Sequence, residues 1–271
     1  MIEKAEEPIL LDDTSVVVVV GAHPDDAVRA CGGVMLRCLR EGARLSIIAM
    51  TDGAALRGTE GIRRGRETAR DRKAEQVRAL DRLGVPVENV FFLGFPDGGI
   101  EKIRHAHRTR LGNAYVCPWL HADRSAKDSL APATPFIAES LTDLLVRALG
   151  PLSPTHVFTH HGRDRHPDHR GVTHFVREVL SELAAERKLR TEPAVYEYLT
   201  YLPGIPWPPA GRETPVESAK ALPFPGRVVN FPLTPEEESR KNAALDCFVP
   251  ILGPGYMDRW RRSNEIFWRT E

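Results

Sequence analysis

The sequence predicts an α/β fold: a Rossmann-like, mostly parallel sheet with helices on both faces. One observation is the unbroken run of five valines at 16–20, which is typical of a strand buried on both sides. Another is that strand-like and helix-like segments alternate after it. The third is that segments rich in histidine and aspartate directly follow two predicted strands, and open α/β sheets bind ligands at that edge.

In the first half of the chain the predicted elements are strand, helix, strand, helix and strand. The helix after the valine run is expected to end at Gly42, because glycine readily adopts the left-handed conformation that closes many helices. A strand is expected at 45–51, a helix over 66–83 with Gly84 just beyond its end, and a third strand over 87–93. This βαβαβ order is typical of a parallel sheet.

Further downstream the alternation continues. Apolar residues at helical spacing predict an amphipathic helix over 137–149 that ends at Gly150. A strand over 155–160, a helix over 169–187 and a strand over 194–200 are expected to follow. The second half therefore extends the same sheet.

We interpret residues 1–271 as a single domain, because a chain of 271 residues that is 42% hydrophobic can bury one large core. Segment 101–135 has no sustained periodicity and is too long for an ordinary connection, so it is expected to be a lid or an insertion near the carboxyl rim of the sheet. Prolines make 203–225 a structured loop rather than a central element. Residues 226–271 are expected to hold a strand and helices, with Thr234 as a helix cap.

Composition excludes several classes of partner. Lys plus Arg and Asp plus Glu both number 37, so no basic footprint predicts nucleic-acid binding. The acidic amino terminus lacks a signal-peptide pattern, and no apolar run approaches membrane-spanning length, so we expect a cytoplasmic protein without a membrane span. The four cysteines include no C-x-x-C pair, and Cys31 and Cys38 lie on an apolar helical stripe, which favours core packing over chemistry.

Two short motifs, His-Pro-Asp-Asp at 23–26 and His-Pro-Asp-His at 166–169, predict one metal site. Zinc takes imidazole and carboxylate ligands and can leave one position open for water. His23 and Asp26 are three apart and can face one centre, which leaves Asp25 free to take a proton from that water. His166 and His169 are also three apart, so that one can bind metal while the other reaches a substrate carbonyl.

Either motif alone also fits a simple turn, in which proline sets the bend and aspartate caps the next helix. Two such motifs after strands of one parallel sheet favour the metal interpretation. Among the other histidines, His160 and His161 are close enough to the second motif to line a pocket. His105, His107 and His121 are expected at the surface and His174 within its helix.

At these residues the chain resembles the zinc-dependent N-acetylglucosaminyl deacetylases known as the PIG-L or LmbE-like family, whose first motif reads A-H-P-D-D-E. The resemblance weakens after about Tyr201. The matching segments are the two motifs and three stretches between them: 22–27, 51–53, 72–75 with 83–85, 93–98 and 166–169.

The resemblance implies a role for each residue of the two motifs. His23, Asp26 and His169 would bind Zn²⁺, and Asp25 would be the general base. His166 would be the cation that stabilises the tetrahedral oxyanion, and Asp168 would orient His166.

The resemblance also implies that Arg72 and Asp97 contact sugar hydroxyls, roles that suit a bidentate donor and an acceptor. An ion pair between them near the rim is the alternative. One departure is Ala27, which stands where the family has glutamate. It removes neither a ligand nor the base, so the chemistry is expected to survive, with altered metal affinity or substrate.

The expected function is zinc-dependent hydrolysis of an N-acyl group, most simply acetyl, from a small-molecule amino sugar or sugar conjugate. One alternative is an amidase of a sugar–thiol conjugate within the same family. A magnesium-dependent phosphohydrolase is another, although the chain has no G-x-x-x-x-G-K-[ST] loop and histidine in both motifs favours zinc. A non-catalytic sugar-binding protein is the third. Relatives often form homo-oligomers, although no apolar surface stripe here requires one.

Overall fold

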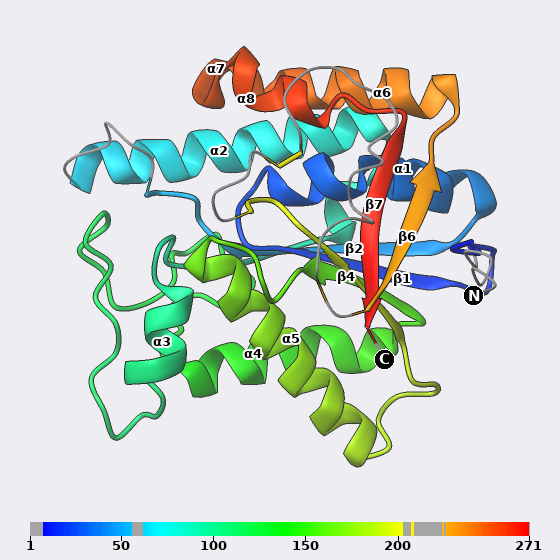
Figure 1. The fold of residues 1–271 in the computed structure, drawn as a ribbon. Coiled ribbons are helices and arrows are strands. Elements are labelled where there is room, and N and C mark those ends of the chain that lie inside the picture. The colour runs from blue at the N-terminus through cyan, green and yellow to red at the C-terminus, as the bar shows by residue number, and fades with distance from the viewer. Residues whose placement is uncertain (1–7, 56–61, 203–206, 209–223, 225, 271) are drawn as a thin grey trace.

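A computed structural model describes residues 8–55, 62–202, 207–208, 224 and 226–270, and every strand it describes belongs to one seven-stranded sheet (Figure 1). The strand order is β3-β2-β1-β4-β5-β7-β6. In chain order the strands are β1 (Val16–Gly21), β2 (Arg44–Thr51), β3 (Val90–Phe95), β4 (His156–His160), β5 (Ala194–Tyr198), β6 (Arg227–Pro232) and β7 (Asn264–Thr270).

The sheet is mostly parallel, as the sequence predicts. β1 pairs in parallel with β2 and β4, β2 with β3, and β4 with β5. In contrast, β7 runs antiparallel to its neighbours β5 and β6. The carboxyl ends of β1 to β5 therefore share one edge, and the start of β7 lies at that same edge.

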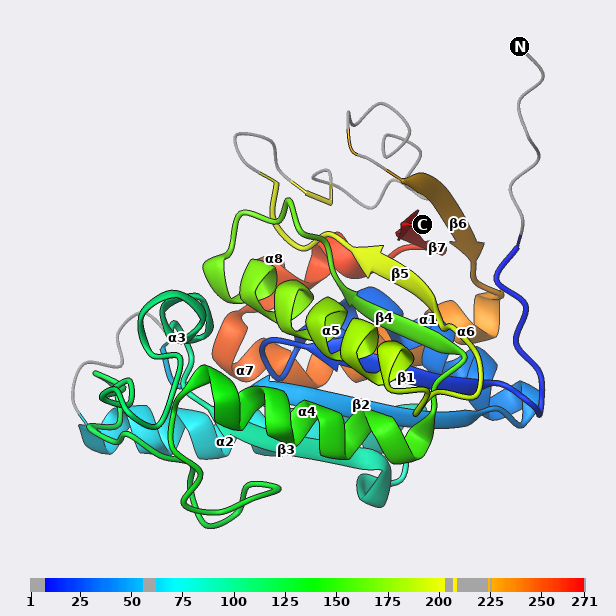
Figure 2. The same cartoon turned by 90° about the horizontal axis from the view of Figure 1, so that it is seen from below.

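Helices cover both faces of the sheet (Figures 1 and 2). The valine run explains how, because Val17 and Val19 belong to the apolar cluster on one face and Val18 and Val20 to the cluster on the other, all of them fully buried. The first face carries α1 (Asp26–Glu41), α2 (Ile62–Leu83) and α6 (Pro235–Leu245), and the second carries α3 (Ile100–Ala106), α4 (Ala138–Leu152) and α5 (Pro167–Ala185).

The C-terminal part contacts α1 through the carboxylate of Glu265, which also forms a buried ion pair with Lys241. α1 is interrupted at Cys31, where φ is −130°. The carboxylate of Glu265, at the start of β7, accepts hydrogen bonds from the backbone N–H groups of Gly33 and Val34 just after this interruption. Lys241 of α6 donates to the same carboxylate at 2.6 Å. Helix α1 is thus held by two elements from the far end of the chain.

Several predictions about boundaries are confirmed. Gly42 ends α1 with a φ of 75°, and Thr234 forms a complete capping box with Glu237 at the start of α6. Cys31 and Cys38 are buried in the core, as expected. The short helices α7 (Val249–Leu252) and α8 (Pro254–Met257) lead from α6 toward β7.

Other boundaries differ from the predictions. α2 begins at Ile62, four residues before the expected start. Residues Val87–Asn89 form a 3₁₀ turn, so the third strand is Val90–Phe95 and not 87–93. Pro86 precedes this turn and favours it. Val87 belongs to the predicted strand because β-branched residues are common in strands.

The second half of the chain departs from the predictions at two helix boundaries. α4 runs through Pro151 to Leu152 rather than ending at Gly150. α5 begins at Pro167, because His166 is its N-cap.

The two irregular segments have different outcomes. Within 101–135 a short helix, α3, was not expected, and the remainder is irregular apart from two isolated bridges. Most of 203–225 lies outside the described residues, so the expected loop there is not described. None of the helices in the described part of the chain combines the length and apolar character that a bilayer crossing requires.

Candidate metal centre

The two histidine motifs meet at the carboxyl edge of the sheet, as expected. Residues 23–26 form a turn directly after β1, in which the N–H of Asp26 donates to the carbonyl of His23 and the N–H of His23 donates to the Asp26 carboxylate at 2.7 Å. His169 lies in the first turn of α5, after β4. The first motif is thus both a tight turn and a part of the cluster, so the two interpretations of it are compatible.

Three donor atoms from these motifs lie close together. Nδ1 of His23 lies 3.1 Å from Oδ2 of Asp26 and 3.1 Å from Nε2 of His169. The third side of this triangle, from Nε2 of His169 to Oδ2 of Asp26, is 3.4 Å. Ligands at about 2.0–2.2 Å from a tetrahedral zinc would be about 3.3–3.6 Å apart. The residues present therefore fit a zinc ion.

The ionisation of Asp26 also suits a metal ligand. Burial opposes ionisation, but His169, His160 and Arg29 together lower the pKa of the Asp26 carboxyl well below its usual range. A carboxylate is the form in which aspartate binds a metal.

Asp164 supports His169, and the sequence did not single it out. Its Oδ1 lies 3.1 Å from Nδ1 of His169, on the opposite side of the ring from the cluster. Its Oδ2 accepts the backbone N–H groups of Thr200 and Tyr201, which fixes the carboxylate. A carboxylate behind a histidine ligand holds the ring in orientation and tautomer. The only sequence signal was its place in the loop just before the second motif.

His160 was expected to line a pocket, and the structure places it in direct contact with the candidate ligand His169. Its ring stacks on that of His169 with 3.7 Å between centroids. Its Nε2 accepts a hydrogen bond from the N–H of Ala22, so this lone pair is occupied. Burial and the neighbouring His169 lower the pKa of His160 to about 4. It packs against a candidate ligand as a neutral ring.

Asp97 and Asp168 both approach the far nitrogen of His23. Oδ1 of Asp97 lies 3.1 Å from Nε2 of His23, and Oδ2 of Asp168 lies 3.5 Å from it. The Asp168 carboxylate also accepts the backbone N–H groups of Gly98 and Ile100 at the start of α3. The structure thus places both carboxylates behind His23.

Asp25 is held between two buried arginines. Its Oδ1 lies 2.6 Å from Nη2 of Arg72 and its Oδ2 lies 2.9 Å from Nη1 of Arg29. Arg72 also donates to the carbonyl of Gly53 and lies 3.5 Å from Asp97. The ion pair that was the alternative for Arg72 and Asp97 is present, and it includes Asp25. Whether the two residues also contact substrate stays a prediction.

Arg29 was missed because a charge in a helix is usually expected at the surface. It is 1% exposed, and its Nη2 donates to Asp26 at 2.6 Å. The rings of Tyr201, Tyr256 and Trp260 lie around its guanidinium. Its spacing of three and four residues from the two aspartates is the signal that could have found it, since such pairs share a helix face.

Ala27, which stands where the family has glutamate, is a core residue. It is buried in the apolar cluster between α1 and the sheet. The missing glutamate therefore leaves no gap among the candidate ligands.

His166 caps α5 and faces His23 and His169. Its Nδ1 accepts the N–H of Asp168, so the ring proton is on Nε2. Its ring centroid lies 4.7 Å from that of His23 and 4.6 Å from that of His169. Burial, with His23 and His169 beside it, lowers the pKa of His166 to about 3. These surroundings favour a neutral ring, and whether His166 is a cation during the reaction stays a prediction.

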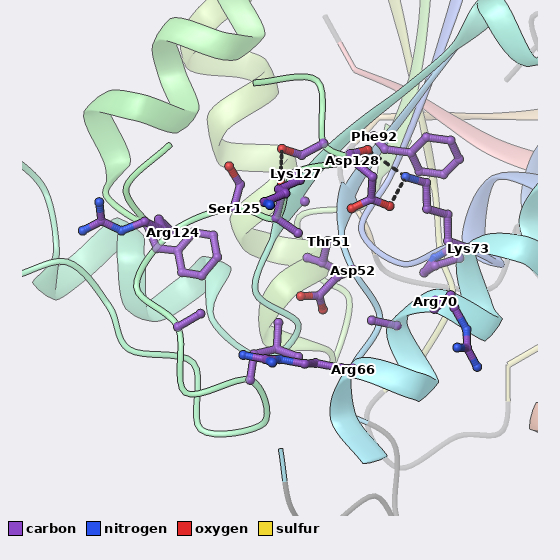
Figure 3. Close-up of a pocket in the computed structure, with 18 residues that line it drawn as sticks. Thr51, Asp52, Arg66, Arg70, Lys73, Phe92, Arg124, Ser125, Lys127 and Asp128 are labelled. Carbon is purple, nitrogen blue, oxygen red and sulfur yellow. Dashed lines mark hydrogen bonds and ion pairs between the residues drawn. The ribbon is translucent and has the colours of Figure 1, made fainter. Parts of the chain in front are cut away.

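A cavity of about 540 Å³ lies beside the centre, between α2 and the irregular segment after α3 (Figure 3). It reaches the centre at Pro24, the neighbour of His23. Asp52 lies in its middle, and Lys73 and Asp128 form an ion pair of 2.6 Å at one end. Burial, reinforced by the Asp97 carboxylate, raises the pKa of Asp52 to about 7, although the backbone N–H of Ala54 donates to it.

Comparison with solved structures identifies the fold. The conserved protein TT1542 from Thermus thermophilus is 23% identical, with a TM-score of 0.51 over 87% of this chain and 79% of that one. N,N'-diacetylchitobiose deacetylase from Pyrococcus horikoshii is 16% identical, with a TM-score of 0.52 over 90% and 70%. GalB, the 4-carboxy-2-hydroxymuconate hydratase from Pseudomonas putida, is 16% identical, with a TM-score of 0.56 over 92% and 83%.

These neighbours share the α/β fold, and the two with a named activity differ, since one is a hydratase and the other a deacetylase. A comparison with curated proteins finds no match. The family model of the GlcNAc-PI de-N-acetylases, PIG-L, matches residues 18–180, which is more than half of the chain and includes both histidine motifs. The chain therefore belongs to the PIG-L family.

Proposed function

We propose that this protein is a zinc-dependent hydrolase that removes an N-acyl group, most simply acetyl, from an amino sugar or a sugar-containing small molecule. The observation that carries the proposal is the close triangle of donor atoms from His23, Asp26 and His169, with the Asp25 carboxylate beside it. Deacetylases among the structural neighbours support the same reaction class.

His23, Asp26 and His169 would hold the ion. When bound, zinc would lower the pKa of a coordinated water toward neutrality and polarise the amide carbonyl. Asp25 would take the proton of the attacking water. Arg29 and Arg72 each contact one oxygen of this carboxylate, so it is fixed in orientation and retains a free lone pair on each oxygen.

His166 would stabilise the negative charge that develops on the carbonyl oxygen. Because its Nδ1 accepts a hydrogen bond from the backbone of Asp168, its Nε2–H is the group left to donate. A neutral donor held in place by the start of a helix is already oriented before charge develops, which is the requirement for oxyanion stabilisation. Asp168 would thus orient His166 through its backbone N–H.

Asp97 and Arg72 would contribute by holding the site and by contacting sugar hydroxyls. Asp97 contacts His23 through one oxygen and accepts the N–H of Ala55 through the other. A substrate contact from this pair would use the lone pairs and donors that remain.

The test is release of primary amine from a panel of N-acetylated glucosaminides and sugar conjugates, with added zinc and with chelator in parallel. Zinc-dependent release of amine is expected. The best substrate would show which group attached to the amino sugar the protein prefers. A sugar–thiol conjugate on the panel decides between the two amide substrates considered for the family.

A phosphorylated sugar should be added to the panel and its phosphate release measured, because phosphate without amine would support a phosphohydrolase instead. Folded, zinc-loaded protein that binds the sugars and releases neither product would contradict the hydrolase and support a binding protein.

A further inference from the structure

The cavity in Figure 3 is lined by residues that the proposed chemistry does not use. Its volume of about 540 Å³ falls within the range of small-molecule sites, about 300–1,000 Å³. Of residues 23–26 only Pro24 lines it, and neither His166 nor His169 does. Arg72 and Asp97 are also outside its lining. The cavity therefore adjoins the candidate metal centre without sharing its functional side chains.

Two segments that are far apart in the sequence bring basic side chains to this cavity. Arg66, Arg70 and Lys73 are spaced by four and three residues, so they lie along one face of α2. Arg124 and Lys127 belong to the irregular segment on the opposite wall (Figure 3). Basic side chains thus line the cavity from two sides.

Three of these basic side chains have carboxylate partners. Lys73 pairs with Asp128 at 2.6 Å within the lining of the cavity. Arg70 and Arg124 each pair with the aspartate next to them in the sequence, at 3.0 Å and 2.8 Å. In Figure 3 the guanidinium groups of these two arginines point away from the cavity. The charges of these three side chains are therefore compensated within the protein.

Arg66 and Lys127 have no such partner. No carboxylate in the described part of the chain lies within ion-pair distance of either, and both side chains are long and exposed, so they can turn toward a ligand. Figure 3 shows them on opposite sides of Asp52, the remaining carboxylate of the lining. Because the pKa of Asp52 is raised to about 7, this carboxyl is partly protonated at neutral pH. The lining therefore keeps a net positive charge, which an anionic ligand would neutralise.

The rest of the lining is mostly apolar and includes the side chains of Phe92, Leu120 and Phe136. Asp52 supplies a hydrogen-bonding group in the middle of it (Figure 3). Its Oδ1 accepts the backbone N–H of Ala54, and its Oδ2 has no hydrogen-bond partner among the residues that the structure describes. Apolar walls with a few polar groups are typical of sites for small organic molecules.

We propose that the cavity in Figure 3 binds an organic phosphate with a flat, mainly apolar body, about the size of a nucleoside monophosphate. A phosphate monoester carries a charge of about −1.5 to −2 at neutral pH, which Arg66 and Lys127 together would balance. The body would lie against the apolar side chains, and its hydrogen-bond donors would reach Oδ2 of Asp52. Binding at this site requires neither zinc nor turnover.

The first experiment is calorimetric titration with AMP, adenosine, inorganic phosphate and pyridoxamine 5′-phosphate. AMP is expected to bind at least about tenfold more tightly than adenosine or inorganic phosphate, because each of these lacks one of the two recognised parts. Pyridoxamine 5′-phosphate distinguishes a smaller aromatic phosphate from a nucleotide, and tight binding of either one supports the proposal. Inorganic phosphate that binds as tightly as both would overturn it.

The double variant Arg66→Gln/Lys127→Gln should bind AMP at least about tenfold more weakly than the wild type, because charge-assisted hydrogen bonds are lost. Adenosine binding should not change. The matched control is Arg63→Gln/Lys102→Gln, which also removes one arginine and one lysine from exposed positions outside the cavity. Its affinity for AMP should equal that of the wild type. An equal fall in both double variants would overturn the proposal, as would no fall in either.

Titration of zinc-free protein separates the cavity from the candidate metal centre. Protein treated with chelator and the His169→Ala variant should both bind AMP as tightly as the zinc-loaded wild type. Binding that requires zinc or His169 would place the phosphate at the metal centre and overturn the proposal. Retained binding would support the cavity even if no amine were released from any substrate.

Discussion

Residues 16–180 and residues 194–270 contribute different things to the candidate centre. The first part supplies all candidate metal ligands, each on a loop or helix start that follows a parallel strand. The second part supplies the side chains around them: Tyr201, Tyr256 and Trp260 against Arg29, and Glu265 against the interruption in α1. The family match ends at 180. The residues of the proposed chemistry thus belong to the matched part, and the rest of the chain packs around them.

The largest expected effect is loss of the metal from the first part. His169→Ala removes one of three protein ligands, so bound zinc and amine release should both fall to background. Metal content by atomic emission after desalting is the measurement. His174→Ala, at the exposed face of the same helix, should keep both. Unchanged zinc in His169→Ala would mean that the ligand set is wrong.

Asp25→Asn should lower catalysis without lowering zinc binding. It retains a side chain that can contact Arg29 and Arg72 but removes the base, so zinc should stay bound while kcat falls by about 10²–10⁴-fold. Steady-state kinetics and metal content on the same preparation test this. Asp71→Asn, an exposed position on α2, is the control. Full activity in Asp25→Asn would remove Asp25 from the mechanism.

Lys241→Met tests whether the second part contributes stability rather than metal binding. Lys241 and Glu265 form an ion pair in which both side chains are at most 2% exposed. Removing the lysine leaves a buried carboxylate without its cation, which is expected to cost about 3–5 kcal/mol in the free energy of unfolding. Urea unfolding measures it. Zinc content of the protein that remains folded should be normal, and loss of zinc without loss of stability would contradict the division of roles.

The difference between the two parts also explains which features the sequence could predict. The valine run and the two histidine motifs are local patterns, and local patterns placed the ligands on one edge of a parallel sheet. β7 has no comparable signal, because seven residues of mixed polarity become a strand only by pairing between β5 and β6. The spacing of Arg29 from Asp25 and Asp26 is a local signal for an ion pair, but its burial depends on rings that are distant in the sequence. Asp164 likewise becomes a buried support for His169 through backbone groups far along the chain.

The smallest expected effect concerns Asp52 in the first part, because burial disfavours the ionised form of its carboxyl group. Its pKa is raised to about 7, largely by burial, against about 3.9 in an unfolded chain. Between these two values the folded state binds more protons than the unfolded state, so the contribution of Asp52 to stability falls as pH rises.

Asp52→Asn keeps the oxygen that accepts from Ala54 and abolishes this titration. The stability of the variant relative to wild type should therefore rise by about 2 kcal/mol between about pH 5 and pH 7. Urea unfolding across this range measures the difference, with Asp81→Asn at the exposed surface of α2 as control. A difference that stays constant with pH would mean that Asp52 is ionised throughout, and that the cavity in Figure 3 carries a full negative charge at its centre.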